Sequence, residues 1–317
     1  MPSVPLVICA LLAFCLRALA QSPPTFRELS FPAGPRIVDH VFLDLDGDGA
    51  KDLMLVRGRE CSLFLQKNGG GYLPERPDQK FNFVDSAILW AHGDVDGDGR
   101  PEILFLTDEG VSYYKWENGR LSFIPKTLLA VQGASILKVA SKDEIRHKDF
   151  YEDLDGDGVA DLLLPGDNCF LLSRGLTGGG FRPPDRLAMR PEVWIDAGGE
   201  SPTSQASSTY WYPQPVSGDF DGDGKRDIFV HQREQVSVFL QRKDGGYGPD
   251  PSLALPLEFQ GDLAEGRFKL DLQLPTKFVD IDGDGLTDIV ATHIGRATTY
   301  VFRGKKDRRD LKTPDAV

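Results

Sequence analysis

One acidic phrase recurs along this chain of 317 residues, and its residue types could bind a metal ion. It reads DLDGDGAKD from Asp44, and close variants begin at Asp94, Asp153, Asp219 and Asp280. Each copy places four carboxylates within nine residues, and such a group repels itself unless a cation lies between its members. Hard oxygen ligands at this density, with no Cys or His among them, favour Ca²⁺ over zinc or copper. The phrase therefore predicts five calcium loops.

The positions inside the phrase support this chemistry, counting from its first Asp as position 1. Glycines at positions 4 and 6, such as Gly47 and Gly49, permit a tight turn with positive φ. Position 7 varies freely, as expected where only a backbone carbonyl binds, and position 2 is always apolar, which suits a side chain reaching into a core. An EF-hand would need Glu at position 12. The five copies have an apolar residue there instead: Leu55, Phe105, Leu164, Val230 and Ala291.

The segments around each phrase predict the elements that position it. A short apolar run follows at once, and a second run rich in Val, Phe and Tyr begins 16 or 17 residues after the first Asp. A Gly-rich turn with an aromatic residue comes next in several copies, as in GGGYLPERP. Such runs, punctuated by Gly and Asn, are typical of strands joined by hairpins. Each unit of about 60 residues therefore supplies about four strands.

A four-stranded sheet cannot bury both faces alone, and radial stacking of such sheets solves this problem. We therefore expect an all-β fold, a β-propeller of about five four-stranded blades spanning residues 21–317, with the variable segments between units as loops on one face. Residues 25–31 resemble the last strand of a unit, and the sequence ends where the fifth unit's last strand would begin. Placing the N-terminal strand there would close the ring. A larger propeller with a truncated C-terminus is the alternative.

With its motif D-x-D-x-D-x-x-x-[DE], the chain resembles the FG-GAP/VCBS-type repeats of secreted bacterial proteins, which are related to the N-terminal β-propeller of integrin α chains. The resemblance covers residues 25–317. It implies that each loop joins the first two strands of a blade and that structural Ca²⁺ binds carboxylates at positions 1, 3, 5 and 9 and the carbonyl at position 7. The implied ligands are Asp44, Asp46, Asp48, Ala50, Asp52, Asp94, Asp96, Asp98, Arg100, Glu102, Asp153, Asp155, Asp157, Val159, Asp161, Asp219, Asp221, Asp223, Lys225, Asp227, Asp280, Asp282, Asp284, Leu286 and Asp288.

The N-terminus predicts secretion. Residues 4–16 are apolar over a length too short to span a bilayer and suited to a signal peptide. Ala18-Leu19-Ala20 follows as a cleavage site, so we expect a signal peptide at 1–20 and an extracellular or periplasmic mature chain from Gln21. Cys15 leaves a lipoprotein anchor open, although Phe14 before it is bulkier than that processing usually accepts. No second apolar run is long enough for a membrane span.

The composition and the insertions point to a binding role. The formal net charge of −12 argues against nucleic acid as a partner. We expect a monomer that binds a protein or a polysaccharide through loops between blades, as an adhesion module. Tyr210, Trp211 and Tyr212, in the longest insertion, are the best candidate contact, because exposed aromatic clusters bind sugars and proteins. The alternative is that these rings pack against the neighbouring blade.

The rival class is a secreted propeller enzyme, a hydrolase or lyase acting on polysaccharide, with its site in the central channel. It would need a charged constellation outside the acidic loops, and the sequence does not supply one. Asp143, Asp149 and Glu152 are merely close together in sequence. The five histidines, which lack any ligand spacing, are interpreted as ordinary strand or loop residues: His40, His92, His147, His231 and His293.

Overall fold

The computed structural model describes residues 30–31, 39–67, 71–72, 75–130, 144–190, 192–196, 207–232, 235–257, 276–293, 298–306, 308 and 310–317. The expected signal segment 1–20 lies outside these residues. All regular elements of the described part are strands, and no helix occurs in it, which confirms the all-β class. Accordingly, no helix among these residues is long and apolar enough to cross a membrane.

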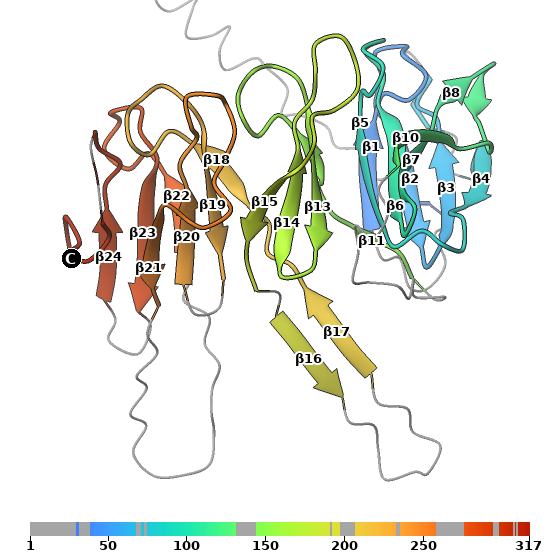
Figure 1. Cartoon of the computed structure of the whole chain (residues 1–317). Helices are drawn as coiled ribbons and strands as arrows, with labels where there is room; N and C mark the ends of the chain where they lie inside the picture. Colours follow the sequence, from blue (N-terminus) through green and yellow to red (C-terminus); the bar gives the residue numbers. More distant parts are fainter. Residues whose placement is uncertain are drawn as a thin grey trace, which may run out of the picture.

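Five sheets of three to five strands follow one another along the chain, and antiparallel pairs of consecutive strands form the body of each (Figure 1). Sheet 1 contains β1 (Asp39–Leu43), β2 (Asp52–Arg57), β3 (Glu60–Phe64) and β4 (Gln79–Asn82). Sheet 2 contains, in spatial order, β10 (Lys126–Ala130), β7 (Gly110–Tyr114), β6 (Glu102–Thr107), β5 (Leu89–Gly93) and β11 (Arg146–His147). Sheet 3 contains β12 (Tyr151–Glu152), β13 (Asp161–Gly166), β14 (Cys169–Ser173) and β15 (Asp185–Ala188). Sheet 4 contains β18 (Val216–Gly218), β19 (Asp227–His231), β20 (Gln235–Phe239) and β21 (Leu253–Pro256). Sheet 5 contains β22 (Thr276–Val279), β23 (Asp288–His293) and β24 (Thr298–Phe302).

The strands that follow loops 1 to 4 are buried on both faces because apolar groups cover both sides of their sheets, whereas β23 buries Ile289 and Ala291 on one face and leaves Val290 half-buried on the other. In β2, Met54 and Val56 face the core shared with sheet 2, whereas Leu53 and Leu55 lie in a separate apolar group on the other face. Such strands read as continuous apolar runs rather than as alternating ones. The apolar run after each acidic phrase therefore has a simple physical cause.

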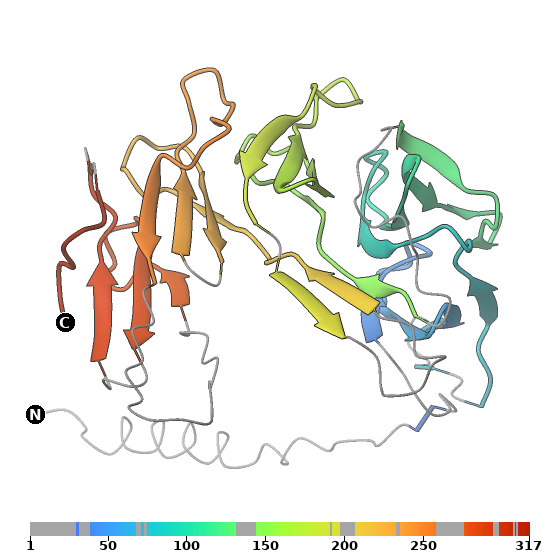
Figure 2. The same cartoon turned by 60° about the horizontal axis from the view of Figure 1, so that its bottom comes forward.

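Four apolar clusters join the sheets in chain order, so that sheet 1 packs on sheet 2, sheet 2 on sheet 3, sheet 3 on sheet 4 and sheet 4 on sheet 5. Figure 1 shows sheets 1 and 2 together at the right, followed by sheet 3 in the middle and sheets 4 and 5 at the left. Figure 2 shows the same arrangement from another side. Among the described residues, no such cluster joins sheet 5 to sheet 1.

The expected closure by an N-terminal strand beside β24 is not what the described residues show. Phe31 instead packs edge-on against Phe64 of sheet 1, with ring centroids 5.0 Å apart. The edge of β24 pairs with the chain's own C-terminal segment, through an antiparallel bridge between Val301 and Ala316. Phe31 contributes to the cover on the outer apolar face of sheet 1, and residues 315–316 satisfy an edge that would otherwise stay unpaired. Residues 25–29 lie outside the described part.

Two additions extend the four-stranded pattern. In sheet 2, β11 adds a parallel strand beside β5, and the short hairpin of β8 (Trp116–Glu117) and β9 (Arg120–Leu121) follows β7. Between sheets 3 and 4, β16 (Glu192–Asp196) and β17 (Ser207–Trp211) form a second hairpin. This hairpin leaves the end of β15 and projects from the edge of the sheets opposite to the acidic loops (Figure 1).

Candidate metal centres

Each of the five acidic loops connects the first two strands of its sheet, as the family resemblance implied. All five use the same backbone turn, in which the glycines at positions 4 and 6 have φ between 73° and 89°. Side chains other than glycine rarely adopt this conformation, which explains the repeated Gly-x-Gly. These glycines are Gly47, Gly49, Gly97, Gly99, Gly156, Gly158, Gly222, Gly224, Gly283 and Gly285.

The first carboxylate holds this turn in place. In loop 1 the backbone N–H groups of Gly47 and Gly49 donate to the two oxygens of Asp44, at 2.9 and 3.0 Å. The other four loops repeat both bonds. The position-5 carboxylate likewise accepts from the N–H of position 7 in every loop. A carboxylate has about four acceptor sites, so these bonds leave lone pairs for a cation.

The carboxylate at position 9 is the buried member of each loop, with a relative exposure of at most 1%. One of its oxygens accepts from the N–H of position 2 at 2.8–3.0 Å in all five loops. In loops 1, 3, 4 and 5 the other oxygen accepts from a backbone N–H just after the third strand, as Gly175 does for Asp161 at 2.9 Å. In these four loops, position 9 therefore ties the start of the loop to the end of the third strand.

The electrostatics of position 9 fit a bound cation. Burial, reinforced by neighbouring loop carboxylates, raises the pKa of Asp52, Asp161 and Asp227 to about 6 and that of Glu102 to about 7. A desolvated carboxylate beside other carboxylates is costly in its charged form, and a divalent cation removes that cost. The donor set therefore suits a hard cation.

The distances between the ligand atoms also fit calcium. In four loops, one oxygen from each of three carboxylates lies within 4.8 Å of the others. Ca²⁺ binds oxygen at about 2.3–2.6 Å, so oxygens around one ion are separated by no more than about 5 Å. These groups are Asp44, Asp46 and Asp48; Asp94, Asp96 and Glu102; Asp153, Asp155 and Asp161; and Asp219, Asp221 and Asp227.

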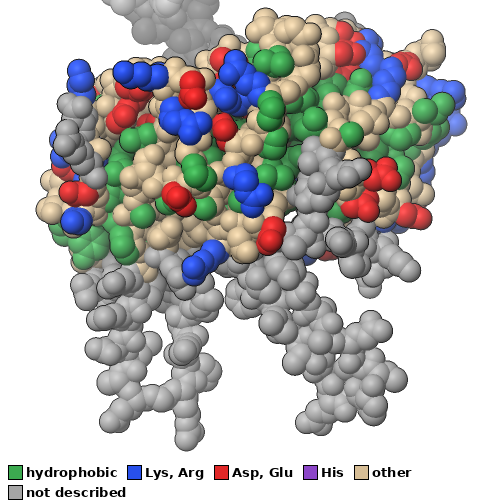
Figure 3. Space-filling model, in the orientation of Figure 1, with side chains coloured by type: hydrophobic (Ala, Val, Ile, Leu, Met, Phe, Trp, Pro, Cys, Tyr) green, Lys and Arg blue, Asp and Glu red, His purple; other side chains and the backbone are tan. Residues whose placement is uncertain are grey.

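Neighbouring loops also contact one another along this edge of the molecule. Arg226 of loop 4 donates to the backbone oxygen of Asp153 in loop 3 at 3.1 Å. A Cβ added at Gly47 in loop 1 would lie 2.8 Å from Cδ of Arg100 in loop 2. Figure 3 shows Lys and Arg side chains standing among Asp and Glu side chains along this edge. Each loop therefore helps to fix the loop beside it.

The apolar residue at position 2 was expected to reach into a core in all five loops, and it does so in three of them. Leu45, Leu154 and Phe220 are each at most 3% exposed and belong to the clusters between consecutive sheets. Val95 packs partly against the cluster of sheets 2 and 3, whereas Ile281 in loop 5 is 52% exposed. The difference arises because, among the described residues, no further sheet covers that side of sheet 5.

Loop 2 differs from the others because a single ammonium group, that of Lys115 just after β7, lies near three of its carboxylates; in loops 4 and 5, Lys225 and Arg303 each pair with one carboxylate. The ammonium group of Lys115 contacts the carboxylate of Asp96 and lies 2.9 Å from Asp98 and 3.7 Å from Glu102. The side chain of Lys115 is only 15% exposed, and its ion pairs with Asp96 and Asp98 raise its pKa. An ammonium group held by three carboxylates competes directly with a metal ion for the same oxygens.

We expect Lys115→Met to increase the Ca²⁺ bound per chain by about one, because the substitution frees Asp96 and Glu102 of their cation and leaves only Arg100 paired with Asp98. In chelator the same variant should be less stable by about 1–3 kcal/mol, since charge-assisted hydrogen bonds are lost. Metal analysis and thermal unfolding with and without Ca²⁺ measure both effects. Lys126→Met is the matched control, because Lys126 pairs with Glu117 and is 46% exposed. An unchanged metal content in Lys115→Met would contradict competition at loop 2.

The aromatic candidates of the longest insertion divide into two groups. Tyr212 is 7% exposed, its ring centroid lies 5.8 Å from that of Phe170, and its hydroxyl donates to the backbone oxygen of Gly166 at 2.8 Å. Tyr212 therefore packs between sheets 3 and 4, in line with the packing alternative. Tyr210 and Trp211 lie in β17, and their side chains are outside what the structure describes.

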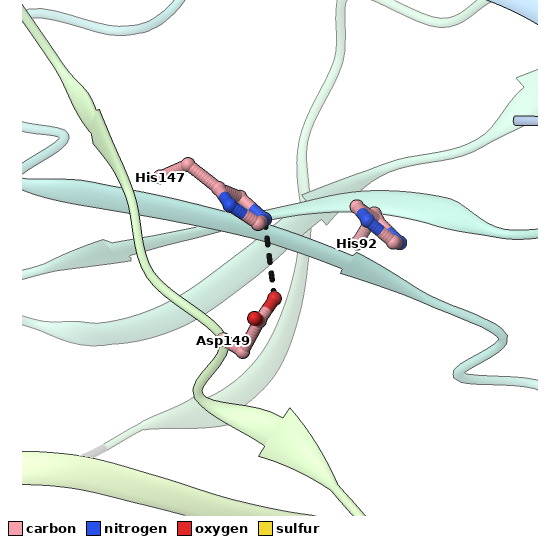
Figure 4. A group of neighbouring side chains, drawn as sticks. All are labelled: His92, His147 and Asp149. Carbon is pink, nitrogen blue, oxygen red and sulfur yellow. Dashed lines mark ion pairs between the residues drawn. The ribbon is translucent and has the colours of Figure 1, made fainter. Parts of the chain in front are cut away.

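The structure also brings together two histidines that were expected to be ordinary strand or loop residues and one of the acidic residues near the third loop. His92, His147 and Asp149 each place one potential ligand atom within 4.8 Å of the others (Figure 4). Oδ2 of Asp39 lies 3.9 Å from Nδ1 of His147. The sequence offered no usable signal for this cluster. His92 and His147 are far apart in the chain and meet only because β11 adds to the edge of sheet 2.

Together, these features define an all-β repeat protein whose consecutive antiparallel sheets each have an acidic loop between their first two strands. No family model matches the chain, and no curated protein matches it. Similar solved structures include an Agrocybe aegerita lectin that recognises non-reducing terminal N-acetylglucosamine, with 15% identity and a TM-score of 0.49. The alignment covers 85% of this chain and 64% of the lectin.

Two further structures are similar over much of the chain. BBS1N, solved in complex with ARL6DN, shares 11% identity at a TM-score of 0.33, covering 89% of this chain and 84% of its own. The V. cholerae biofilm matrix protein Bap1 shares 15% identity at a TM-score of 0.25, covering 74% of this chain and 40% of its own. With TM-scores below 0.5, these likenesses assign neither a ligand nor a family to this chain.

Proposed function

We propose that this protein is a secreted binding module of the β-propeller type, stabilised by Ca²⁺ in its acidic loops. The observation that carries the proposal is the buried carboxylate at position 9, which recurs in all five loops with the same backbone bond. A merely polar turn has no need of a desolvated carboxylate facing two others. Such a group is stable when a cation shares its oxygens.

In this proposal the bound ion supplies positive charge that compensates the clustered carboxylates. The chain's own residues do the rest. The Gly-x-Gly turn points backbone N–H groups at position 1, and position 9 links the loop to the end of the third strand. Millimolar Ca²⁺ outside cells would keep even modest sites filled, which agrees with the signal peptide expected at 1–20.

The partner surface in this proposal is the edge opposite to the acidic loops. The β16–β17 hairpin projects from that edge and holds Tyr210 and Trp211 (Figure 1). Amphipathic aromatic residues suit either a polysaccharide or a protein partner. The monomeric chain would then use its sheets as a rigid frame and its insertions as the contact.

We expect Trp211→Ala to lose binding without loss of stability, whereas Tyr212→Ala should lower the free energy of unfolding by about 3–5 kcal/mol. The second effect follows from deletion of a buried aromatic side chain and its hydrogen bond. A panel of immobilised polysaccharides and secreted proteins, probed in Ca²⁺ and read beside thermal unfolding, measures both. Unaltered binding by Trp211→Ala would show that Trp211 is not part of the partner surface. Hydrolysis or cleavage of a polysaccharide by the parent protein would show that it is an enzyme rather than a binding module.

A further inference from the structure

Four side chains with nitrogen or oxygen ligand atoms converge where sheet 1 meets sheet 2. Asp39 begins β1, His92 lies in β5, His147 ends β11, and Asp149 follows two residues later. His147 pairs in register with Trp90, and His92 lies two residues beyond Trp90 on the same face of β5. The added strand β11 therefore brings both imidazoles to one face of the sheet.

The geometry of the cluster is close to that of a three-ligand metal site. The two imidazole rings stack with centroids 5.6 Å apart and an interplanar angle of 8°. Nε2 of His147 lies 3.3 Å from Oδ1 of Asp149 (Figure 4). One potential ligand atom from each of His92, His147 and Asp149 lies within 4.8 Å of the others. Ligand atoms around tetrahedral zinc are about 3.4 Å apart, so modest side-chain rotations complete the site.

The two nitrogens of His147 face different carboxylates. Nε2 is buried and makes no hydrogen bond, although Asp149 is near, while Nδ1 faces Oδ2 of Asp39 at 3.9 Å. In metal-binding histidines one nitrogen binds the ion and a carboxylate orients the other. Asp39 is thus the carboxylate nearest to Nδ1, and a movement of less than 1 Å would bring it within hydrogen-bond distance and leave the Nε2 lone pair for an ion.

The backbone around the cluster is fixed by several elements. The N–H of Lys148 donates to the oxygen of Trp90 at 2.9 Å, and the N–H of Ile145 donates to that of Gly58 in sheet 1 at 3.1 Å. The side-chain amide of Gln214, in the insertion before β18, donates to the backbone oxygen of Asp149 at 3.0 Å. The segment from 145 to 149 is therefore held by sheet 1, sheet 2 and the insertion together. Ligands held on such a frame lose little entropy on binding a metal.

The surroundings of the imidazoles also suit metal binding. The Trp90 ring lies 4.5 Å from that of His147 and is fully buried, so it forms an apolar floor. The side chain of Asp149 is 59% exposed, which leaves one side of the cluster open to water.

We propose that His92, His147 and Asp149 bind a divalent transition-metal ion of the zinc class, with Asp39 as a positioning residue. Two imidazole nitrogens and one carboxylate are borderline ligands that prefer such ions over Ca²⁺, whereas the all-oxygen loops have the opposite preference. Three protein ligands leave a fourth position for water or a small ligand, as in open zinc sites. The molecule would then bind two classes of metal ion at separate places.

The test uses Co²⁺ as a spectroscopic probe on the purified protein saturated with Ca²⁺. We expect one Co²⁺ per chain, with the visible absorption typical of four-coordinate cobalt bound by imidazole, and displacement by Zn²⁺. Asp149→Asn and His147→Gln should remove this absorption. Asp39→Asn should retain it with about 10–100-fold weaker binding, because it removes only the group that orients His147. Exposed His40 lies outside the cluster, so His40→Gln is the control variant and should bind like the parent protein.

The Ca²⁺-dependent melting temperature checks that each variant is folded, and the exposed Asp149 is the substitution least able to disturb folding. Cobalt binding that survives both His147→Gln and Asp149→Asn would overturn the proposal, as would absence of binding at millimolar Co²⁺. Failure of the loops to bind Ca²⁺ would not affect this test. The cobalt absorption depends on imidazole nitrogen ligands, and the acidic loops contain none.

Discussion

Removal of Ca²⁺ is expected to lower the melting temperature of this protein by about 8–14 °C. An ion present at tenfold its Kd adds about 1.4 kcal/mol to folded-state stability, and four or five such sites add about 5–7 kcal/mol. Each kcal/mol shifts the melting temperature of a chain of about 300 residues by about 1.5–2 °C, because the unfolding entropy is about 2 cal/mol/K per residue. The effect is large because clustered carboxylates repel one another at every loop once the ions are gone.

Thermal unfolding in Ca²⁺, in Mg²⁺ and in chelator measures this expectation. Mg²⁺ should restore little of the loss, because it demands a compact octahedral shell and gives up its water reluctantly. High salt in chelator is a useful control, since screening by salt acts on exposed charges of every kind. Equal melting temperatures in Ca²⁺ and in chelator would show that the loops hold themselves together without an ion.

Asp161→Ala is expected to be the most damaging single substitution in a loop. Asp161 is fully buried and accepts from the N–H groups of Leu154, Asp155 and Gly175 at 2.9–3.2 Å. Its loss leaves these donors without their partner in a buried site, which should cost about 3–5 kcal/mol even in chelator. Urea unfolding in chelator and in Ca²⁺ measures the change.

Asp157→Ala is the matched control in the same loop. Asp157 is exposed and accepts one bond, from the N–H of Val159 at 2.8 Å, so its loss in chelator should cost well under 1 kcal/mol. In Ca²⁺, however, both variants should lose the stabilisation that the ion gives to loop 3. Equal effects of the two substitutions in chelator would mean that position 9 has no structural role beyond metal binding.

Local features of the fold could be predicted from the sequence because local chemistry dictates them. The Gly-x-Gly turn needs positive φ at two places, and this requirement is written in neighbouring residues and recurs in all five loops. The apolar run that follows each loop is likewise local, and it predicts the strand in all five sheets. The positions of the carboxylates within a loop follow for the same reason.

Features that depend on contacts between distant segments could not be predicted in this way. The edge of β24 pairs with residues 315–316 rather than with the N-terminal strand, because edge strands accept any chain that reaches them. Lys115 reaches the carboxylates of loop 2 from the end of β7. His92 and His147 meet through β11, a two-residue strand with no sequence pattern of its own.

The metal content of the purified protein, after equilibrium dialysis against Ca²⁺ with excess Mg²⁺, addresses the role of the acidic loops most directly. We predict about four to five Ca²⁺ ions per chain, with loop 2 the weakest site because Lys115 competes there, and loss of one ion in Asp161→Ala. Retention of no Ca²⁺, or equal uptake of Mg²⁺, would contradict the proposal that these loops are calcium sites.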